Sequence, residues 1–299
     1  MIISASRRTD IPAFYGAWLM NRIEAGYCLV PSAFGGPGGK PYRVDLRPEA
    51  VDAFVFWTKN LAPFRDSLAE VRARGIPFVV LHTVNGYPRA LEPRVPPAEE
   101  AVGQMHELAA RYGPRTAVWR YDPVLFTDAT PPEFHRENFR RLAKALRGAT
   151  DEVIVSVLCE YRKTRRNLAA AGREHGFRRL SPASEDVRSL IADLALLSRA
   201  QGMELTLCCR PELVVEGTRA AHCVDVARLS DAAGRPVAAK PKQTRPGCGC
   251  FESRDVGAYD TCGHGCAYCY AVDDPAAAAK RLARHDPRAE MLASGEAGR

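Results

Sequence analysis

Short apolar runs recur along most of the chain and are separated by polar stretches. Six of them are rich in Val, Ile, Phe or Leu and show little apolar–polar alternation. Strands that are covered on both faces have this composition, as in a parallel sheet with helices on its faces. We therefore predict six buried strands, at Ile2–Ser6, Ala53–Trp57, Phe78–His82, Ala117–Arg120, Val153–Cys159 and Glu204–Cys209.

Between these runs, apolar residues recur at the three- and four-residue spacing of amphipathic helices. The four clearest sets are Phe64, Leu68 and Val71; Val102, Met105, Ala109 and Tyr112; Phe139, Leu142 and Leu146; and Val187, Leu190, Ile191, Leu194 and Leu197. Pro131-Pro132 and Ser181-Pro182 are predicted to open the last two helices. Six alternations of strand and helix predict an α/β fold, which we interpret as a six-unit parallel β/α partial barrel of TIM-like type. An open, doubly wound sheet is the alternative.

Composition narrows the class of protein. The chain has 299 residues, of which 46% are apolar and 26% charged, and its mean hydropathy is −0.23. These values exclude a disordered, collagen-like or membrane-embedded protein. No apolar run approaches the roughly 18 residues of a membrane span, and residues 1–12 do not resemble a secretory signal. We expect a cytoplasmic protein, whose net charge of +7 suits anionic ligands but does not by itself indicate nucleic-acid binding.

The periodic pattern ends near residue 235, so we divide the chain into three parts. Residues 1–235 are predicted to form the partial barrel, and 236–273 an irregular cysteine-rich segment over its mouth. Residues 274–299 are predicted to form a helix with a frayed tail. Because the middle part has little apolar surface to bury, we expect a metal to order it. Gly35–Gly39 lacks the Lys-Ser/Thr of a phosphate-binding loop and is interpreted as a flexible loop.

Charged side chains follow the predicted strands. In parallel α/β folds the reactive groups gather at the carboxyl ends of the strands. We therefore expect an electropositive face there, suited to a carboxylate or phosphate, with aspartates orienting the basic groups. The predicted catalytic residues are Arg7, Arg8, Asp10, Lys59, Arg120 and Asp122, and Arg162 adds to the positive charge.

Ten cysteines are present, and five of them lie between positions 248 and 269. In a reducing compartment such density indicates metal binding rather than disulfides. Cys262, Cys266 and Cys269 have the spacing C-x3-C-x2-C, which can ligate three irons of one 4Fe–4S cluster and leave the fourth iron open. Gly263 and Gly265 allow the short loop to wrap around the cluster.

This motif, with Tyr268 before its last cysteine, resembles the hallmark C-x3-C-x-aromatic-C of the radical S-adenosylmethionine superfamily. The resemblance implies a six-unit partial β/α barrel and S-adenosylmethionine bound at the open iron. It also implies reductive cleavage to a 5′-deoxyadenosyl radical and an electron donor such as flavodoxin or ferredoxin. Tyr268, Lys59 and Arg120 are expected to contact the cofactor, and the substrate to be small and anionic. The family places its motif after the first strand. Here it follows the sixth unit, so residues 240–270 must return to the barrel mouth.

Nearly the whole chain also resembles a bacterial family of domains of unknown function, the one numbered eighteen forty-eight. Four stretches carry this resemblance: ISASRRTDIPAFY at 3–15, FWTKN at 56–60, WRYDP at 119–123 and GCGCFESRDVGAYDTCGHGCAYCYA at 247–271. It implies membership of that family and no particular reaction.

The other cysteines suggest a second metal site. Cys248 and Cys250 share a short loop, and Cys208, Cys209 and Cys223 can complete a four-thiolate set for an auxiliary iron–sulfur cluster or a structural zinc. The alternative is that these three are buried hydrophobic residues, as we expect for Cys28 and Cys159.

Two alternative interpretations remain open. Cys262, Cys266 and Cys269 could bind structural zinc with His264 or Cys250 as the fourth ligand. The protein would then be a metal-ordered nucleic-acid-binding or repair-related protein using the basic run Tyr161–Asn167. Alternatively, an iron–sulfur protein could bind S-adenosylmethionine without cleaving it, or only transfer electrons.

Overall fold

A computed structural model describes residues 1–31 and 40–293, so Gly35–Gly39 and the end of the predicted tail lie outside the described residues. The main sheet has eight strands, all parallel and in the order β10-β1-β4-β5-β6-β7-β8-β9, and it is not closed. Its six central strands are the six predicted from the apolar runs. Their bounds are β1 Ile2–Ala5, β4 Ala53–Thr58, β5 Phe78–Thr83, β6 Ala117–Val124, β7 Glu152–Val157 and β8 Glu204–Leu207.

Strands of two residues extend both edges of this sheet. β9, Arg219–Ala220, pairs with β8, and β10, Arg254–Asp255, pairs with β1. A separate antiparallel hairpin, β2 Tyr27–Val30 and β3 Tyr42–Asp45, was not predicted.

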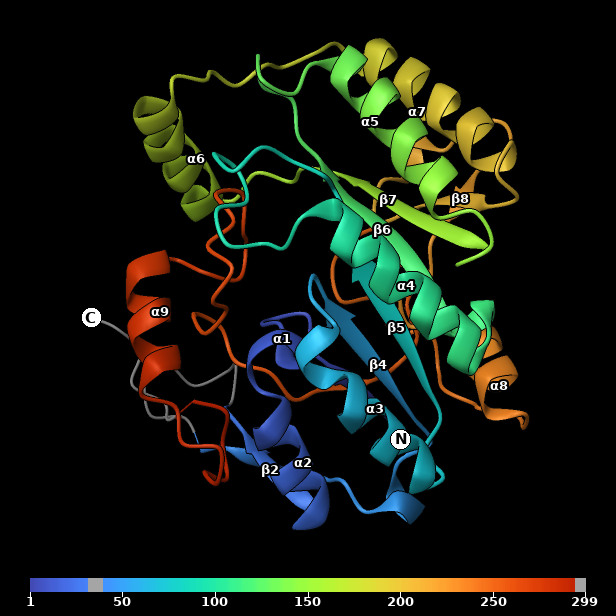
Figure 1. Ribbon diagram of the computed structural model, residues 1–299, viewed down its shortest axis with the longest axis vertical. Helices are drawn as coiled ribbons and strands as arrows, with labels where there is room; N and C mark the ends of the chain where they lie inside the picture. The colour runs from blue at the N-terminus through green and yellow to red at the C-terminus, as the bar shows by residue number, and fades with distance from the viewer. Residues whose placement is uncertain (32–39, 294–299) are drawn as a thin grey trace.

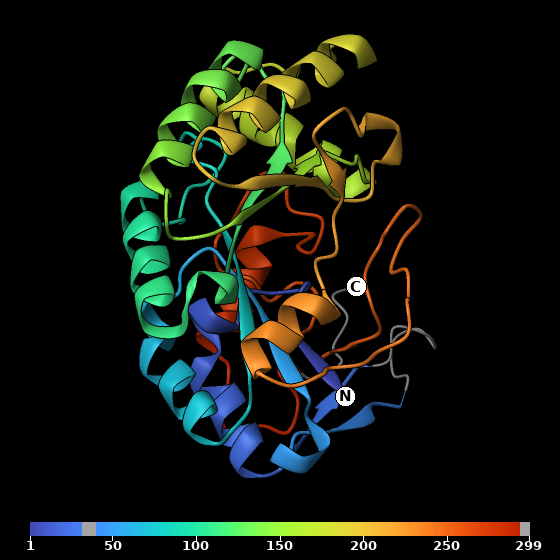
Figure 2. The same cartoon turned by 90° about the vertical axis from the view of Figure 1, so that its right-hand side faces the viewer.

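The two faces of the main sheet have separate apolar layers because successive side chains point to opposite sides. Phe54, Phe56 and Trp119 lie on the face that the long helices cover. Those helices are α2 Gly16–Glu24, α3 Arg65–Ala73, α4 Ala98–Tyr112, α5 Pro132–Ala145 and α7 Ser184–Arg199 (Figure 1). Val55 and Ile154 lie on the opposite face, which packs against α8, Val226–Ala233, and several cysteines. Figure 2 shows α3, α4 and α5 on one side of the sheet and α8 on the other.

Helix starts agree only partly with the prediction. α5 begins at Pro132, directly after Pro131, as expected. α7 begins at Ser184 with Ala183 as its N-cap, so Ser181-Pro182 precedes the helix and does not open it. The remaining α-helices are α1 Ile11–Phe14, α6 Arg162–His175 and α9 Pro275–Ala283, and the short 3-10 helices are Pro48–Ala50, Ala62–Phe64, Pro114–Thr116 and Pro211–Leu213. None of the helices in the described ranges is both long enough and apolar enough to cross a membrane.

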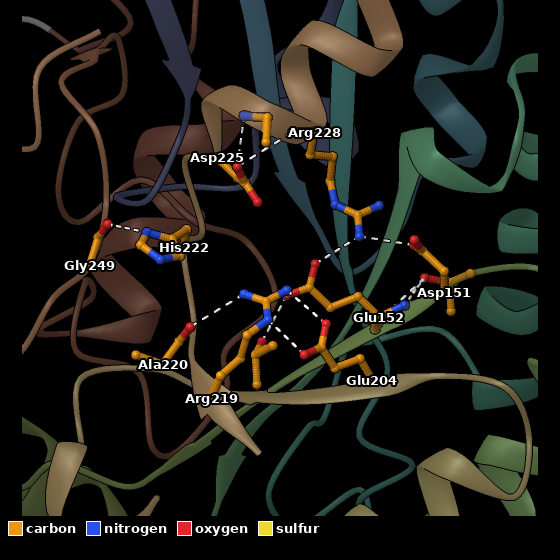
Figure 3. Close-up of polar contacts among 12 residues, drawn as sticks. Asp151, Glu152, Glu204, Arg219, Ala220, His222, Asp225, Arg228 and Gly249 are labelled. Atoms are coloured by element: carbon orange, nitrogen blue, oxygen red, sulfur yellow. Dashed lines mark hydrogen bonds and ion pairs between the residues drawn. The ribbon is translucent and has the colours of Figure 1, made fainter. Parts of the chain in front are cut away.

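A buried ion pair fixes α8 near the start of β7. Arg228 Nη2 lies 2.8 Å from Glu152 Oε2 and 2.9 Å from Asp151 Oδ1, and both Arg228 and Glu152 are 3% exposed (Figure 3). The second Glu152 oxygen accepts from Thr206 Oγ1 at 2.8 Å. These bonds satisfy charges that would be costly to bury alone and hold α8 across the sheet.

The cysteine-rich segment returns to the first strand. β10 is parallel to β1, with Arg254 opposite Ile3 and Asp255 opposite Ser4. The chain leaves β10 at the carboxyl edge of the sheet, meaning the edge where the parallel strands end. Cys262, Cys266 and Cys269 follow within 14 residues of Asp255. The segment that we separated as 236–273 therefore contributes a strand to the main sheet.

Candidate functional site

Cys262, Cys266 and Cys269, here called the cysteine trio, lie on an irregular loop against the carboxyl edge. The Ala267 N–H donates to the Leu91 carbonyl at 3.0 Å, and Arg94 Nε donates to the Gly263 carbonyl at 2.6 Å. The loop between β5 and α4 thus fixes the trio through one backbone bond and one side-chain bond to the backbone of the cysteine loop.

In the described structure, the three thiols of the trio influence one another electrostatically but make no sulfur–sulfur contact with one another. Burial raises the pKa of Cys262 to about 12, although the backbone N–H groups of His264 and Asp10 lower it. Burial also raises the pKa of Cys266 and Cys269, and the Ala271 N–H donates to Cys269 Sγ at 3.3 Å. Burial therefore favours the neutral thiol form of all three groups.

Glu92 joins the trio to the end of β4. Its Oε1 accepts from Lys59 Nζ at 2.7 Å, from Asn85 Nδ2 at 3.0 Å and from the Tyr268 hydroxyl. Burial lowers the pKa of Lys59, but nearby acidic groups, chiefly the Glu92 carboxylate, together raise it by more, so the net direction is upward. Lys59 is therefore a buried ammonium, and its Nζ lies 5.6 Å from the centre of the Tyr268 ring.

Asp10 joins the same loop to the ends of β1 and β4. Its Oδ2 lies 2.8 Å from His264 Nε2 and accepts from the Lys59 N–H at 2.7 Å. Its Oδ1 accepts from the Ala13 N–H and caps α1. The predicted residues Asp10 and Lys59 thus lie beside the trio.

The other predicted charges are also paired, so the expected electropositive face is largely neutralised. Asp255 lies 3.5 Å from Arg7 Nε and 3.9 Å from Arg8 Nε. Arg120 pairs with Asp122. Of these predicted basic groups, Arg7 Nη1 and Arg120 Nε are nonetheless buried and have no hydrogen-bond partner among the described residues. Arg162 is exposed at the start of α6.

A polar cavity of about 230 Å³ adjoins this site. Glu92 and Asn85, which contact Tyr268, also line the cavity. Arg89 lines it as well and donates to the carbonyls of Pro93 and Val95 rather than to a carboxylate. The Glu92–Tyr268 contact therefore links the wall of the cavity to the cysteine motif.

The remaining predicted cysteines form a second cluster, here called the cysteine ring. Cys208 Sγ lies 3.5 Å from Cys209 Sγ and 3.8 Å from Cys223 Sγ. Further thiol contacts link Cys209 to Cys248, Cys248 to Cys250, and Cys250 to Cys223. The structure thus brings together all five residues that the sequence assigned to a second site. Cys28 is buried and Cys159 exposed, and neither makes a thiol contact with the ring.

Neither group is a preformed metal site. In the described part of the chain, no three His, Cys, Asp or Glu side chains are already arranged to hold a metal ion. The contacts above therefore show that the cysteines of the ring lie close together.

Two residues of the basic run Tyr161–Asn167 make hydrogen bonds within the fold. Arg166 Nη2 donates to the Asp273 carbonyl at 2.5 Å, and Asn167 Nδ2 donates to the same oxygen at 3.1 Å. These bonds attach α6 to the chain that follows the cysteine trio, and they occupy two of the groups proposed to bind nucleic acid.

Three site residues were missed by the sequence analysis: Asn85, Glu92 and Asp255. Asp255 accepts from Ser4 Oγ at 2.9 Å and Ser6 Oγ at 2.7 Å, in addition to its contacts with the two arginines. The position of Asn85 just after a predicted strand was the one available signal. Glu92 stands in an irregular loop without a motif, and Asp255 lies in the two-residue strand β10, which is too short to show a sequence pattern.

Fold and site together define a parallel α/β protein with two cysteine clusters, one of them at the carboxyl edge of its sheet. The chain belongs to the family described as "Domain of unknown function (DUF1848)", whose model matches residues 2–271. A search of curated proteins gives no match. Among solved structures, a triazine hydrolase variant is similar at 11% identity and a TM-score of 0.32. The match covers 78% of this chain and 57% of the hydrolase chain.

Proposed function

We propose that the protein is an iron–sulfur enzyme of the radical S-adenosylmethionine type. The observation that carries the proposal is the placement of Cys262, Cys266 and Cys269 beside the ends of β1 and β4. Six central strands in sequential order, β1-β4-β5-β6-β7-β8, support the finer interpretation of the sheet as a TIM-like partial barrel.

The trio fits a 4Fe–4S cluster chemically. Three thiols on one short loop, without direct sulfur–sulfur contact, suit three irons of one cluster better than a single ion. Backbone N–H groups near Cys262 and Cys269 stabilise thiolate charge, as hydrogen bonds to the sulfurs do in iron–sulfur proteins. When bound, the cluster would supply single electrons and one open iron for the amino and carboxylate groups of S-adenosylmethionine.

Residues of this chain would then position the ligands. Tyr268 and Lys59, held by Glu92, keep the cysteine loop in a fixed orientation. Arg7 Nη1 and Arg120 Nε are buried donors without partners, so they are available to a carboxylate of cofactor or substrate. A small anionic substrate would occupy the polar cavity next to Glu92, with Arg89 as a further cation.

The test uses the full chain, purified without oxygen and reconstituted with iron and sulfide. We expect iron and acid-labile sulfide in the wild type and in the control Cys159→Ser, whose thiol is exposed and outside both clusters. Cys266→Ser should lose most of both. Dithionite and S-adenosylmethionine together should release 5′-deoxyadenosine from the wild type and from Cys159→Ser but not from Cys266→Ser.

Each result separates the alternatives. Iron and sulfide without 5′-deoxyadenosine would reduce the proposal to a cluster protein that binds S-adenosylmethionine non-reductively or transfers electrons. Zinc alone at the trio would reject the iron–sulfur proposal and favour a metal-ordered binding protein.

A further inference from the structure

The cysteine ring is a second site whose geometry differs from that of the trio. We propose that Cys208, Cys223, Cys248 and Cys250 bind one metal ion of the zinc class, independently of any cluster at the trio. These four thiols are 4 to 7% exposed, whereas Cys209 is only partly buried.

The sulfur separations distinguish a single ion from a cluster. With Zn–S bonds of about 2.3 Å in a tetrahedron, two ligand sulfurs lie about 3.8 Å apart. Cys208 Sγ and Cys223 Sγ are 3.8 Å apart. Thiolates that bind different irons of a 4Fe–4S cube must lie farther apart, because a cluster edge separates their irons. Cys208 and Cys223 are therefore too close to bind different irons of a cube and have the spacing of two ligands of one ion.

Arg245 is an independent indication that these sulfurs carry negative charge. Its Nε donates to Cys209 Sγ at 2.9 Å, and its Nη2 donates to Cys208 Sγ at 3.6 Å. Among the described residues no carboxylate pairs with this side chain. Both side-chain acceptors of this partly buried guanidinium are sulfur atoms. This arrangement is expected beside metal-bound thiolates, because the metal ion neutralises only part of the negative charge of its thiolate ligands. Neutral thiols would leave that guanidinium poorly compensated.

Contacts around the sulfurs hold the ligand loops together. His222 Nδ1 is hydrogen-bonded to the Gly249 carbonyl, which links the residue before Cys223 to the loop of Cys248 and Cys250 (Figure 3). Thr244 Oγ1 donates to Cys248 Sγ at 3.4 Å. These bonds supply the second layer that orients ligands in structural metal sites. Side-chain rotation would close the sulfurs around an ion, since the present arrangement does not yet enclose one.

Such a site explains how an irregular stretch stays ordered. Residues 235–253 contain no helix or named strand, yet Val237, Cys248 and Cys250 among them are buried on the face of the sheet that packs against α8. One ion held by the end of β8, the segment after β9 and the 248–250 loop would cross-link all three. The free energy of metal binding would then stabilise residues 235–253, which bury little apolar surface of their own.

The experiment uses the full chain with all three trio cysteines replaced by Ser, which removes the first site. We expect one zinc per chain, no acid-labile sulfide, and a tetrahedral thiolate absorption spectrum after substitution with cobalt(II). Adding Cys223→Ser or Cys250→Ser should abolish zinc retention, whereas adding Cys209→Ser or Cys159→Ser should preserve it.

A measurement on the wild-type protein covers the case in which ligand variants do not fold. Titration with a thiol-binding mercurial should release zinc in step with about four thiols, the number of ligands in a structural zinc site. Iron with sulfide at the ring, or disulfides without metal, would overturn the proposal. This proposal rests on zinc bound by a variant that lacks the trio cysteines, whereas the iron–sulfur proposal rests on iron and sulfide lost in Cys266→Ser. The two proposals can therefore fail independently.

Discussion

Lys59 and Glu92 form a buried ion pair, with Nζ 2.7 Å from Oε1, at the point where the cysteine loop meets the sheet. Their side chains are 14% and 5% exposed. The Tyr268 hydroxyl and Asn85 share the same carboxylate oxygen. Glu92 therefore connects the end of one strand to the loop that carries the cysteine trio.

Removing the Glu92 charge should destabilise the protein strongly. Glu92→Gln leaves the Lys59 ammonium buried without its counter-ion, which costs about 3 kcal/mol or more. Urea unfolding of the variant measures the loss. Glu99→Gln is the matched control, since Glu99 pairs with Arg141 while 73% exposed and should cost less than about 1 kcal/mol. Equal losses for the two variants would show that Glu92 does not hold a buried charge.

The two carboxylate oxygens of Asp10 have separable roles: Oδ1 caps α1, and Oδ2 binds His264 and the Lys59 N–H. Asp10→Asn keeps a good N-cap but weakens the charge-assisted bond to His264. We expect faster amide exchange in residues 261–269, by about tenfold for a loss of about 1.4 kcal/mol, with α1 unchanged. Protection lost equally in both segments would contradict this separation.

His135 should make stability depend on pH. Burial lowers its pKa from 6.5 to about 4, and its Nδ1 accepts from the Tyr121 hydroxyl while its Nε2 donates to the Leu125 carbonyl. Because the unfolded state binds the proton more tightly, this stabilisation is complete above pH 6.5 and is lost as pH falls toward 4. Between pH 7 and pH 5 we expect a loss of about 2 kcal/mol from this group.

The matched variant for that measurement is His135→Gln, which can keep both hydrogen bonds without titrating. Its unfolding free energy should fall less steeply over the same pH interval. If the two proteins have the same pH slope, His135 is not the group responsible.

The ion pair of Glu152 and Arg228 should matter more than its exposed neighbour. Glu152→Gln leaves Arg228 buried with only Asp151 as counter-ion, and we expect a loss of about 2 to 3 kcal/mol in urea unfolding. Glu204→Gln, which breaks a pair with Arg219 at 49% and 43% exposure, should cost less than about 1 kcal/mol. A reversed order would contradict the assignment of Glu152 as the anchor of α8.

The sequence predicted the six central strands because burial on both faces leaves continuous apolar runs. It could not predict β9 and β10, because two residues are too few to show a period. The cysteines were found by their spacing, which is a local property. The partners of Arg7, Arg8 and Lys59 were not found, because Asp255 and Glu92 reach them only through tertiary folding. For the same reason the expected positive face is mostly neutralised.

The pairing of β10 with β1 joins Ser4 to Asp255, 251 positions later in the chain. During translation, β1 is therefore synthesised long before β10, its neighbour in the sheet. The trio follows β10 in the chain, so any cofactor can be loaded there only after all strands of the main sheet have been synthesised. Until β10 is made, Ser4, Arg7 and Arg8 lack their acidic partner, Asp255, and must be hydrated or bound by a chaperone.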